Sequence, residues 1–164
     1  MTDRKRSRNG FTLVELVVVV AILAMLAAIV MPSVSMSDKR KLDTVQVAIQ
    51  DAIDHAQSLA YHKGEPYGVK FHVVKQWFAV VNDKATPVED PLSHGPYIVY
   101  LNNPGMPGNI ELESAQFNGR LVAGFNEKGI LQYGGEVVIR GGETSRRLLI
   151  NSATAKLVEA PIEP

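Results

Sequence analysis

The architecture of this chain follows from its segment Arg8-Asn9-Gly10-Phe11-Thr12-Leu13-Val14-Glu15-Leu16. A carboxylate, Glu15, stands there at the start of an apolar run that continues to Met31, and no further charged residue occurs before Asp38. A run of this length is sufficient to cross a hydrocarbon core of about 30 Å. The residues before Gly10 are predominantly basic, so the positive-inside rule holds them in the cytoplasm and places the rest of the chain outside the inner membrane.

Glu15 is unusual because a charge inside a bilayer helix costs roughly 2.5–3.5 kcal/mol on insertion scales, so the residue needs a partner. A cut between Gly10 and Phe11 would create an α-amine four residues before Glu15, and helical residues at that spacing share a face. The amine and the carboxylate would then carry opposite charges at nearly the same depth.

The segment from Gly10 to Glu15, followed by the apolar run, resembles the class III signal of type IV pilins and type II secretion pseudopilins. The resemblance implies that a prepilin peptidase removes the leader after Gly10 and that Phe11 is then N-methylated. It also implies that Glu15 pairs with the amine of a neighbouring subunit during filament assembly. The expected partners are other pilin-like subunits, an inner-membrane assembly platform and, before assembly, the lipid bilayer.

Two other interpretations of the N-terminus stay open at this point. An ordinary secretory signal peptide would be cut before Met36, after the small residues Ser33 and Ser35. A plain transmembrane anchor would stay uncut. Glu15 within the apolar run and the length of that run both argue against the signal peptide.

Apolar residues recur at steps of three and four from Leu42 to Ala60, which predicts that the helix continues beyond the apolar run. Gly64 and Pro66 are typical of a helix end, so we expect one helix from Phe11 to about Lys63. Pro32 removes a backbone hydrogen bond within it and predicts a kink.

Beyond Gly64, short β-type runs alternate with Gly, Pro and Asn, which indicates antiparallel strands and turns. The expected fold class is therefore α+β, with a long kinked helix packed on an antiparallel β-sheet head, as in type IV pilins. The expected strands are Tyr67–Val74, Gln76–Val81, Tyr97–Leu101, Ile110–Leu112, Val122–Phe125, Glu136–Arg140, Arg147–Ile150 and Lys156–Val158. The expected organisation is a leader (1–10), a transmembrane and filament-core helix (11–36), an amphipathic helix (37–63), a β head (64–158) and a loose tail (159–164).

The segments His55–Phe71 and Phe125–Val158 are also similar to the minor pseudopilin group known as GspH/FimT. The shared features include the Phe125–Gly129 turn and the strands around Gly134–Arg140 and Arg146–Ile150. One departure is Ala155, which stands where that group usually has a glycine. The tyrosine-proline and glycine-leucine pattern typical of the major pseudopilin is absent after the helix, which favours a minor subunit.

Residues that could carry chemistry are scattered. The chain has no cysteine and a formal net charge of zero, so it offers no thiol chemistry, no disulfide and no global basic field for nucleic acid. No nucleophile with a base partner and no phosphate-binding loop is recognisable, so we expect neither an enzyme nor a cofactor. The weaker candidates are a histidine metal site (His55, His62, His72, His94), a calcium site (Asn82, Asp83, Glu89, Asp90) and a basic patch (Lys128, Arg140, Ser145, Arg146, Arg147).

The histidines lack the spacing of metal ligands, and the acidic cluster does not fit a calcium-binding loop. Acidic residues are interleaved with the basic ones, so a mixed solvated sheet face is the favoured interpretation of the patch, and DNA binding is not expected. Of the two long loops, Asn82–Pro96 and Asn102–Asn109, the first is our candidate for contact with a partner.

The sequence hypothesis is a minor pseudopilin of a type II secretion system, processed by prepilin peptidase and assembled into a short periplasmic filament. The alternatives are a minor type IV pilin serving adhesion, motility or DNA uptake, and a membrane-anchored or secreted binding domain that never polymerises.

Overall fold

Helix α1 (Leu13–Lys63) precedes all the strands in the computed structural model, which describes residues 13–161 except for the side chains of residues 26–37. The chain falls into two units, Met1–Ser37 and Asp38–Pro164. The second unit, called the head below, holds the second part of α1 together with the strands. The two units are described separately.

α1 ends at the residue that the sequence predicts. Gly64 has a φ of +66°, a left-handed conformation that glycine adopts without steric cost, and its N–H donates to the carbonyl of Ala60 at 3.0 Å. This is a common way to terminate a helix, since it satisfies a carbonyl of the last turn. His62 and Lys63 lie in that turn, where basic side chains interact favourably with the helix dipole.

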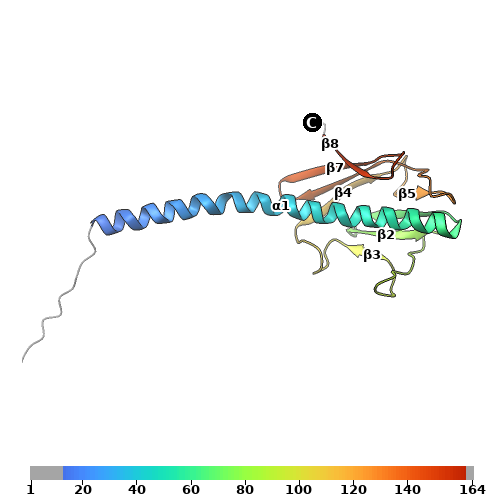
Figure 1. Ribbon diagram of the computed structural model, residues 1–164, viewed down its shortest axis with the longest axis horizontal. Helices are drawn as coiled ribbons and strands as arrows, with labels where there is room; N and C mark the ends of the chain where they lie inside the picture. The colour runs from blue at the N-terminus through green and yellow to red at the C-terminus, as the bar shows by residue number, and fades with distance from the viewer. Residues whose placement is uncertain (1–12, 162–164) are drawn as a thin grey trace, which may run out of the picture. The chain divides into compact units, whose positions relative to one another are not determined.

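The strands of the head form two four-stranded antiparallel sheets, with the orders β3-β2-β1-β5 and β4-β6-β7-β8. α1 lies across both, with β7 and β8 toward one side of the helix and β2 and β3 toward the other (Figure 1). The strands are β1 (Tyr67–His72), β2 (Trp77–Asn82), β3 (Ile98–Tyr100), β4 (Ile110–Gln116), β5 (Val122–Phe125), β6 (Glu136–Gly141), β7 (Thr144–Ile150) and β8 (Leu157–Ala160).

The α+β prediction is confirmed and each expected strand is present, with differences in the number of sheets and in strand bounds, such as β7, which begins at Thr144 rather than Arg147. The sequence predicts one sheet, whereas the strands divide into two. β4 continues to Gln116 rather than ending at Leu112, because a bulge between Leu112 and Ser114 interrupts the alternation of inward and outward side chains by which a strand is recognised. β8 continues to Ala160, where pairing with Arg147 extends the strand.

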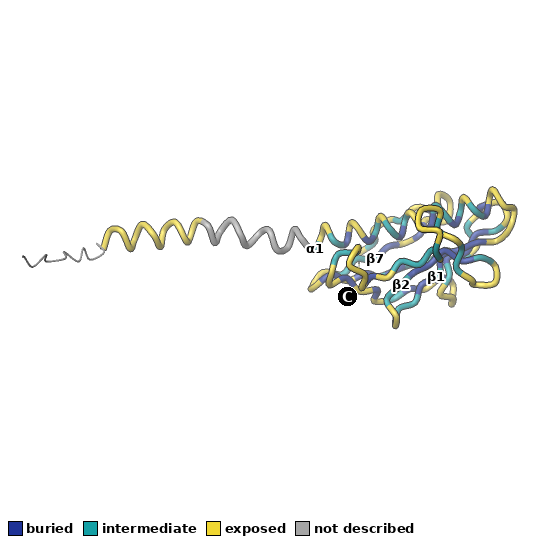
Figure 2. Tube along the Cα trace, turned by 90° about the horizontal axis from the view of Figure 1, so that it is seen from below, coloured by how far each residue is buried: buried dark blue, intermediate teal, exposed yellow. Residues whose placement is uncertain are grey.

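The core of the head lies between α1 and the inner faces of both sheets (Figure 2). The helix contributes residues at the predicted steps, and all of them are fully buried: Leu42, Val45, Ile49, Ala52, Ile53, Ala56 and Ala60. The sheets contribute buried aromatic rings, of which Phe71 from β1 stacks on Phe117 with ring centroids 5.2 Å apart. Burial of each large apolar side chain stabilises the fold by about 1.5–3 kcal/mol.

One contact joins the two sheets through a side chain. Gln76, in the turn between β1 and β2, bonds to both the N–H and the carbonyl of Leu112 in β4. At the other end of β4, within its own sheet, Gly135 lies so close that an added Cβ would come within 2.0 Å of the Gln116 carbonyl oxygen. The Gln76 contact fixes how the two sheets meet, and Gly135 allows β4 and β6 to approach closely.

Candidate assembly interface

The described first part of α1 is apolar on all sides. Its large apolar residues are between 48% and 80% exposed, namely Leu13, Val14, Leu16, Val17, Val18, Val19, Val20, Ile22, Leu23 and Met25. A helix that is apolar all round is normally buried in a core or in lipid, and no segment of the described chain covers this one. The surface therefore requires a partner outside this chain. Across the residues open to description, no helix is both long enough and apolar enough to cross a membrane.

Glu15 lies in the first turn of α1, within this apolar surface. A carboxylate is stabilised there by the helix dipole, whose positive end is at the N-terminus. Gly10 and Phe11 lie outside the described residues, so the cleavage site, the methylated amine and its pairing with Glu15 stay predictions. The helix is continuous at Pro32, whose side chain is outside the description, and the kink there also stays a prediction.

A polar stripe runs along α1 in the head and contacts the C-terminal part of the chain. Its members recur at steps of three and four, so they lie on one helix face: Asp43, Gln46, Gln50, Asp54 and Gln57. Each forms a hydrogen bond or an ion pair with a residue beyond position 128 in the sequence. This stripe, called the polar seam below, fastens the helix to β7, β8 and the turns beside them.

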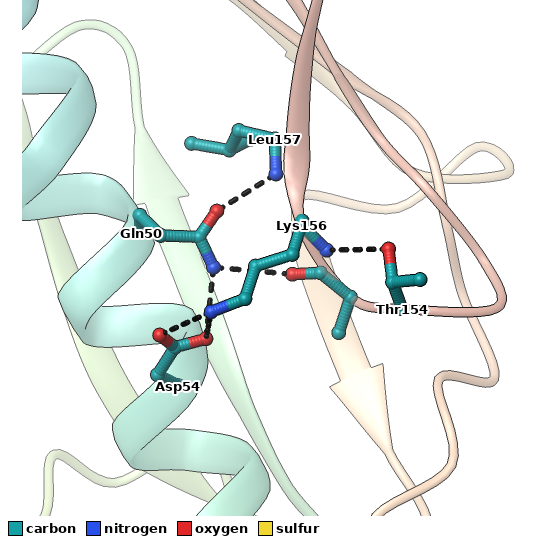
Figure 3. A network of polar contacts seen from close by, with 6 residues as sticks. Gln50, Asp54, Thr154, Lys156 and Leu157 are labelled. Carbon is teal, nitrogen blue, oxygen red and sulfur yellow. Dashed lines mark hydrogen bonds and ion pairs between the residues drawn. The ribbon is translucent and has the colours of Figure 1, made fainter.

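The centre of the polar seam is Gln50 (Figure 3). Its Oε1 accepts the N–H of Leu157 at 2.7 Å, and its Nε2 donates to the carbonyl of Ala155 at 3.2 Å. One turn further on, the carboxylate of Asp54 pairs with the ammonium group of Lys156 at 2.7 Å. The side-chain amide of Gln50 thus occupies the outer edge of β8, where an added strand would otherwise bind.

Arg146 binds the N-terminal end of the polar seam, at Asp43 and Gln46. Its side chain is only 12% exposed, and its guanidinium group donates to Asp43 and to Gln46, each at 2.7 Å, while the carboxylate of Glu159 in β8 lies 3.6 Å away. A largely buried arginine requires such partners, because an unpaired buried charge is strongly unfavourable.

The other arginines of the predicted basic patch are paired as well. Arg140 donates to Glu111 at 3.0 Å, and this hydrogen bond raises the pKa of the Arg140 guanidinium. Arg147 lies 2.6 Å from Glu136. The outer face of β4, β6 and β7 is therefore of mixed charge, as the interleaved acids indicate.

The loop between β2 and β3, our candidate partner loop, is braced by its own hydrogen bonds. Asp90 accepts the N–H of Leu92 at 2.9 Å and the hydroxyl of Ser93 at 2.8 Å, and these bonds lower the pKa of the Asp90 carboxyl. Tyr97 at the loop's end stacks on His55 of α1 with ring centroids 5.2 Å apart, and burial raises the pKa of the Tyr97 phenol. Within the loop, Leu92 is 90% exposed.

The weaker candidates do not come together. His55 stacks on Tyr97, whereas His72 accepts the N–H of Lys75 and His94 lies beside Glu89. The oxygens of Asn82 and Asp90 accept backbone N–H groups of their own turns. Within the described part of the chain, no cluster of three or more His, Asp or Glu residues is placed to hold a metal ion.

A folded head behind a helix whose apolar surface needs a partner defines a subunit that assembles through its N-terminal helix. Comparison with known proteins agrees with this class. The prokaryotic N-terminal methylation motif matches residues 5–31. The type II secretion system core protein G of Aeromonas hydrophila is 30% identical over 129 residues, which cover 71% of this chain and 87% of that protein.

A second relative, the type IV wide pilus major component of Thermus thermophilus, is 47% identical over 49 residues, which cover 29% of this chain and 37% of that protein. No solved structure matches the chain. Neither relative is named as a member of the GspH/FimT group that the sequence resembles.

The chain belongs to the family of type IV pilin-like proteins that includes the pseudopilins. It is a pilin or pseudopilin subunit of a type II secretion system or a type IV pilus, with a structural rather than an enzymatic role. Membership implies a precursor anchored in the inner membrane, processing by prepilin peptidase and assembly with other pilins.

The polar seam is the feature that sequence reasoning missed. Its residues have the same helical spacing as the core residues, so the sequence pattern indicates only the solvent-exposed face of an amphipathic helix. Only the folded chain shows that their partners lie about a hundred residues away, as with Gln50 and Leu157.

Proposed function

We propose that the chain is a pseudopilin of a type II secretion system. In this proposal it is inserted in the inner membrane with its head outside, cut after Gly10, methylated at Phe11 and built into a short periplasmic filament by an inner-membrane assembly platform. The single observation that carries the proposal is the apolar helix surface around Glu15, which the described chain leaves exposed. The similarity to the Aeromonas core protein G spans most of both chains, which supports type II secretion over other systems.

We further propose a minor rather than a major role in that filament. The support is in the sequence, since the tyrosine-proline and glycine-leucine pattern of the major pseudopilin is absent after α1. The resemblance to the GspH/FimT group also points this way. Its one departure has a simple physical account, because Ala155 adopts the left-handed conformation, φ +55°, for which that group uses glycine.

Glu15 acts in this proposal as a registration device. In a core of packed helices, a correctly placed subunit pairs Glu15 with the Phe11 amine of its neighbour. A subunit in another register leaves a charge buried and unpaired, which is strongly unfavourable. The lipid bilayer holds the same helix before assembly.

The first test is the intact mass and N-terminal sequence of the protein purified from cell membranes. A chain that begins at methylated Phe11 supports the proposal. A chain that begins at Met36 refutes it in favour of a secreted domain, and an uncut chain indicates a plain anchor.

The second test compares Glu15→Ala with Glu65→Ala, a control at an exposed position just beyond α1. We expect both variants to be exported and cleaved, and only Glu15→Ala to lose incorporation into the filament and secretion of exported proteins. Normal recovery of Glu15→Ala in filaments would contradict the registration role.

The other candidate function is that of a minor type IV pilin, which the similarity to the Thermus wide-pilus component favours. Deletion of the gene separates the two, because a pseudopilin mutant loses secretion whereas a pilin mutant loses adhesion, motility or DNA uptake. Direct DNA binding is not part of either proposal, since the arginines Arg140, Arg146 and Arg147 are each paired with acidic residues.

A further inference from the structure

We propose that β8 is an exchangeable strand, and that the groove between β7 and the polar seam accepts the β8 strand of a second copy of this chain. The proposal rests on the hinge before β8 and on the contacts of the strand, and it is independent of the secretion system that the chain serves.

The position of β8 in its sheet allows the strand to be released without disrupting the other strands. It lies at the edge of its sheet and is the last strand of the described chain, so its release breaks backbone pairing with β7 alone. Two of its side chains, Val158 and Glu159, are exposed, whereas Leu157 is half-buried against the core. Its polar contacts are with Gln50 and Arg146. A second copy supplies the same strand and can therefore remake every one of these contacts.

The segment that joins β7 to β8 is short and strained. Ala155 has a φ of +55°, a left-handed conformation that is unfavourable for a residue with a Cβ. The turn closes through Asn151, whose side-chain oxygen accepts the N–H groups of Ala153 at 2.9 Å and Thr154 at 3.2 Å. In an exchanged dimer this segment extends and the left-handed conformation is released. A short hinge under strain favours strand exchange for this reason.

The occupant of the groove is specified by its polar contacts. Gln50 presents one acceptor and one donor to the strand's outer edge, Asp54 receives a lysine just before the strand, and Arg146 faces an acidic residue within it. The segment from Ala155 to Glu159 meets all of these requirements. A second copy of this chain is therefore the partner that the groove fits.

The absence of cysteine allows a direct test with a disulfide. Leu149 of β7 and Val158 of β8 lie opposite each other and are both exposed, so Leu149→Cys/Val158→Cys in the full chain can form a disulfide across the pair. The purified protein in detergent micelles is incubated at rising concentration, oxidised, and run on a denaturing gel without reductant. An intramolecular disulfide gives a monomer band, and exchange gives a covalent dimer that grows with protein concentration.

The matched control is Val138→Cys/Arg147→Cys, a facing pair in the hairpin of β6 and β7, which cannot exchange by release of β8. We expect it to give monomer only. Monomer only from both pairs at every concentration would overturn the proposal, and so would dimer in equal amounts from both, because it would report nonspecific association.

Two hinge variants in the Leu149→Cys/Val158→Cys background have opposite expected effects. Ala155→Gly removes the strain of the closed hinge, and we expect it to lower the dimer-to-monomer ratio by about threefold, since loss of a buried methyl partly offsets the gain. Asn151→Ala removes the side-chain bonds that brace the closed turn and leaves its backbone bonds, and we expect it to raise the ratio. Unchanged ratios in both variants would overturn the role of the hinge.

Discussion

Gln76 offers the sharpest test of how the two sheets are held together. Its Oε1 accepts the N–H of Leu112 at 2.6 Å, and its Nε2 donates to the carbonyl of the same residue at 3.0 Å. Leu112 is only 1% exposed, so water has little access to its backbone. One side chain thus satisfies both backbone groups of a buried residue in the other sheet.

The expected cost of Gln76→Ala follows from these two bonds. A buried donor or acceptor that loses its partner costs about 1–3 kcal/mol, so two such groups are expected to lower the free energy of unfolding by about 3 kcal/mol. For a domain of this size, that corresponds to a fall in Tm of roughly 10 °C. Gln76 also has a φ of +55°, so Gln76→Gly loses the same bonds but regains about 1 kcal/mol from the relief of backbone strain.

The neighbouring Trp77 is the sole tryptophan and provides the assay, thermal unfolding followed by its fluorescence. The control is Gln116→Ala, which removes an exposed glutamine from the same strand as Leu112 and is expected to change stability by less than about 0.5 kcal/mol. The reasoning is refuted if Gln76→Ala matches this control, or if Gln76→Gly is less stable than Gln76→Ala.

Three further predictions concern the rest of the head. Gly135→Ala places a Cβ against the Gln116 carbonyl and is expected to cost more than about 2 kcal/mol in thermal unfolding. The lowered pKa of the Asp90 carboxyl means that its bonds brace the loop above the ordinary carboxyl pKa, 3.8, and are lost as the pH falls through the lower folded value. The check is hydrogen exchange at the Leu92 amide, whose protection relative to the intrinsic exchange rate should fall over that pH range. Arg146→Ala leaves Asp43 and Gln46 without their partner, and we expect the free energy of unfolding to fall by about 1–3 kcal/mol and amide hydrogen exchange in β8 to become faster.

Each of these has a matched control. Gly105→Ala adds a Cβ that meets nothing within 4 Å, so a loss equal to that of Gly135→Ala would contradict the steric argument. Asp90→Asn should abolish the pH dependence of the loop, and its persistence would assign the effect to another group. Arg140→Ala removes an exposed ion pair, which contributes little to stability because solvent screens it, so a larger loss there than at Arg146 would show that burial is not what matters.

The helical part of this fold is readable from the sequence because its signals are local. The spacing of the apolar residues from Leu42 to Ala60, at steps of three and four, indicates one buried helix face. Gly64 marks the helix end because glycine adopts a positive φ without steric cost. The strands are readable for the same reason, including the turn at Asn118-Gly119, where both residues have positive φ. The apolar N-terminal run with Glu15 likewise identifies the family through residues that are adjacent in the chain.

What only the tertiary structure decided is how these elements meet. The division into two sheets, the joint at Gln76 and the polar seam each depend on partners far apart in the sequence, and a polar residue such as Gln50 has the same local pattern whether it faces water or β8. The strain at Ala155 is likewise invisible in the sequence, because alanine carries no signal for a left-handed turn until pairing with β7 and the bond from Gln50 hold it there. Local propensity determined the elements, and long-range packing and hydrogen bonding determined their arrangement.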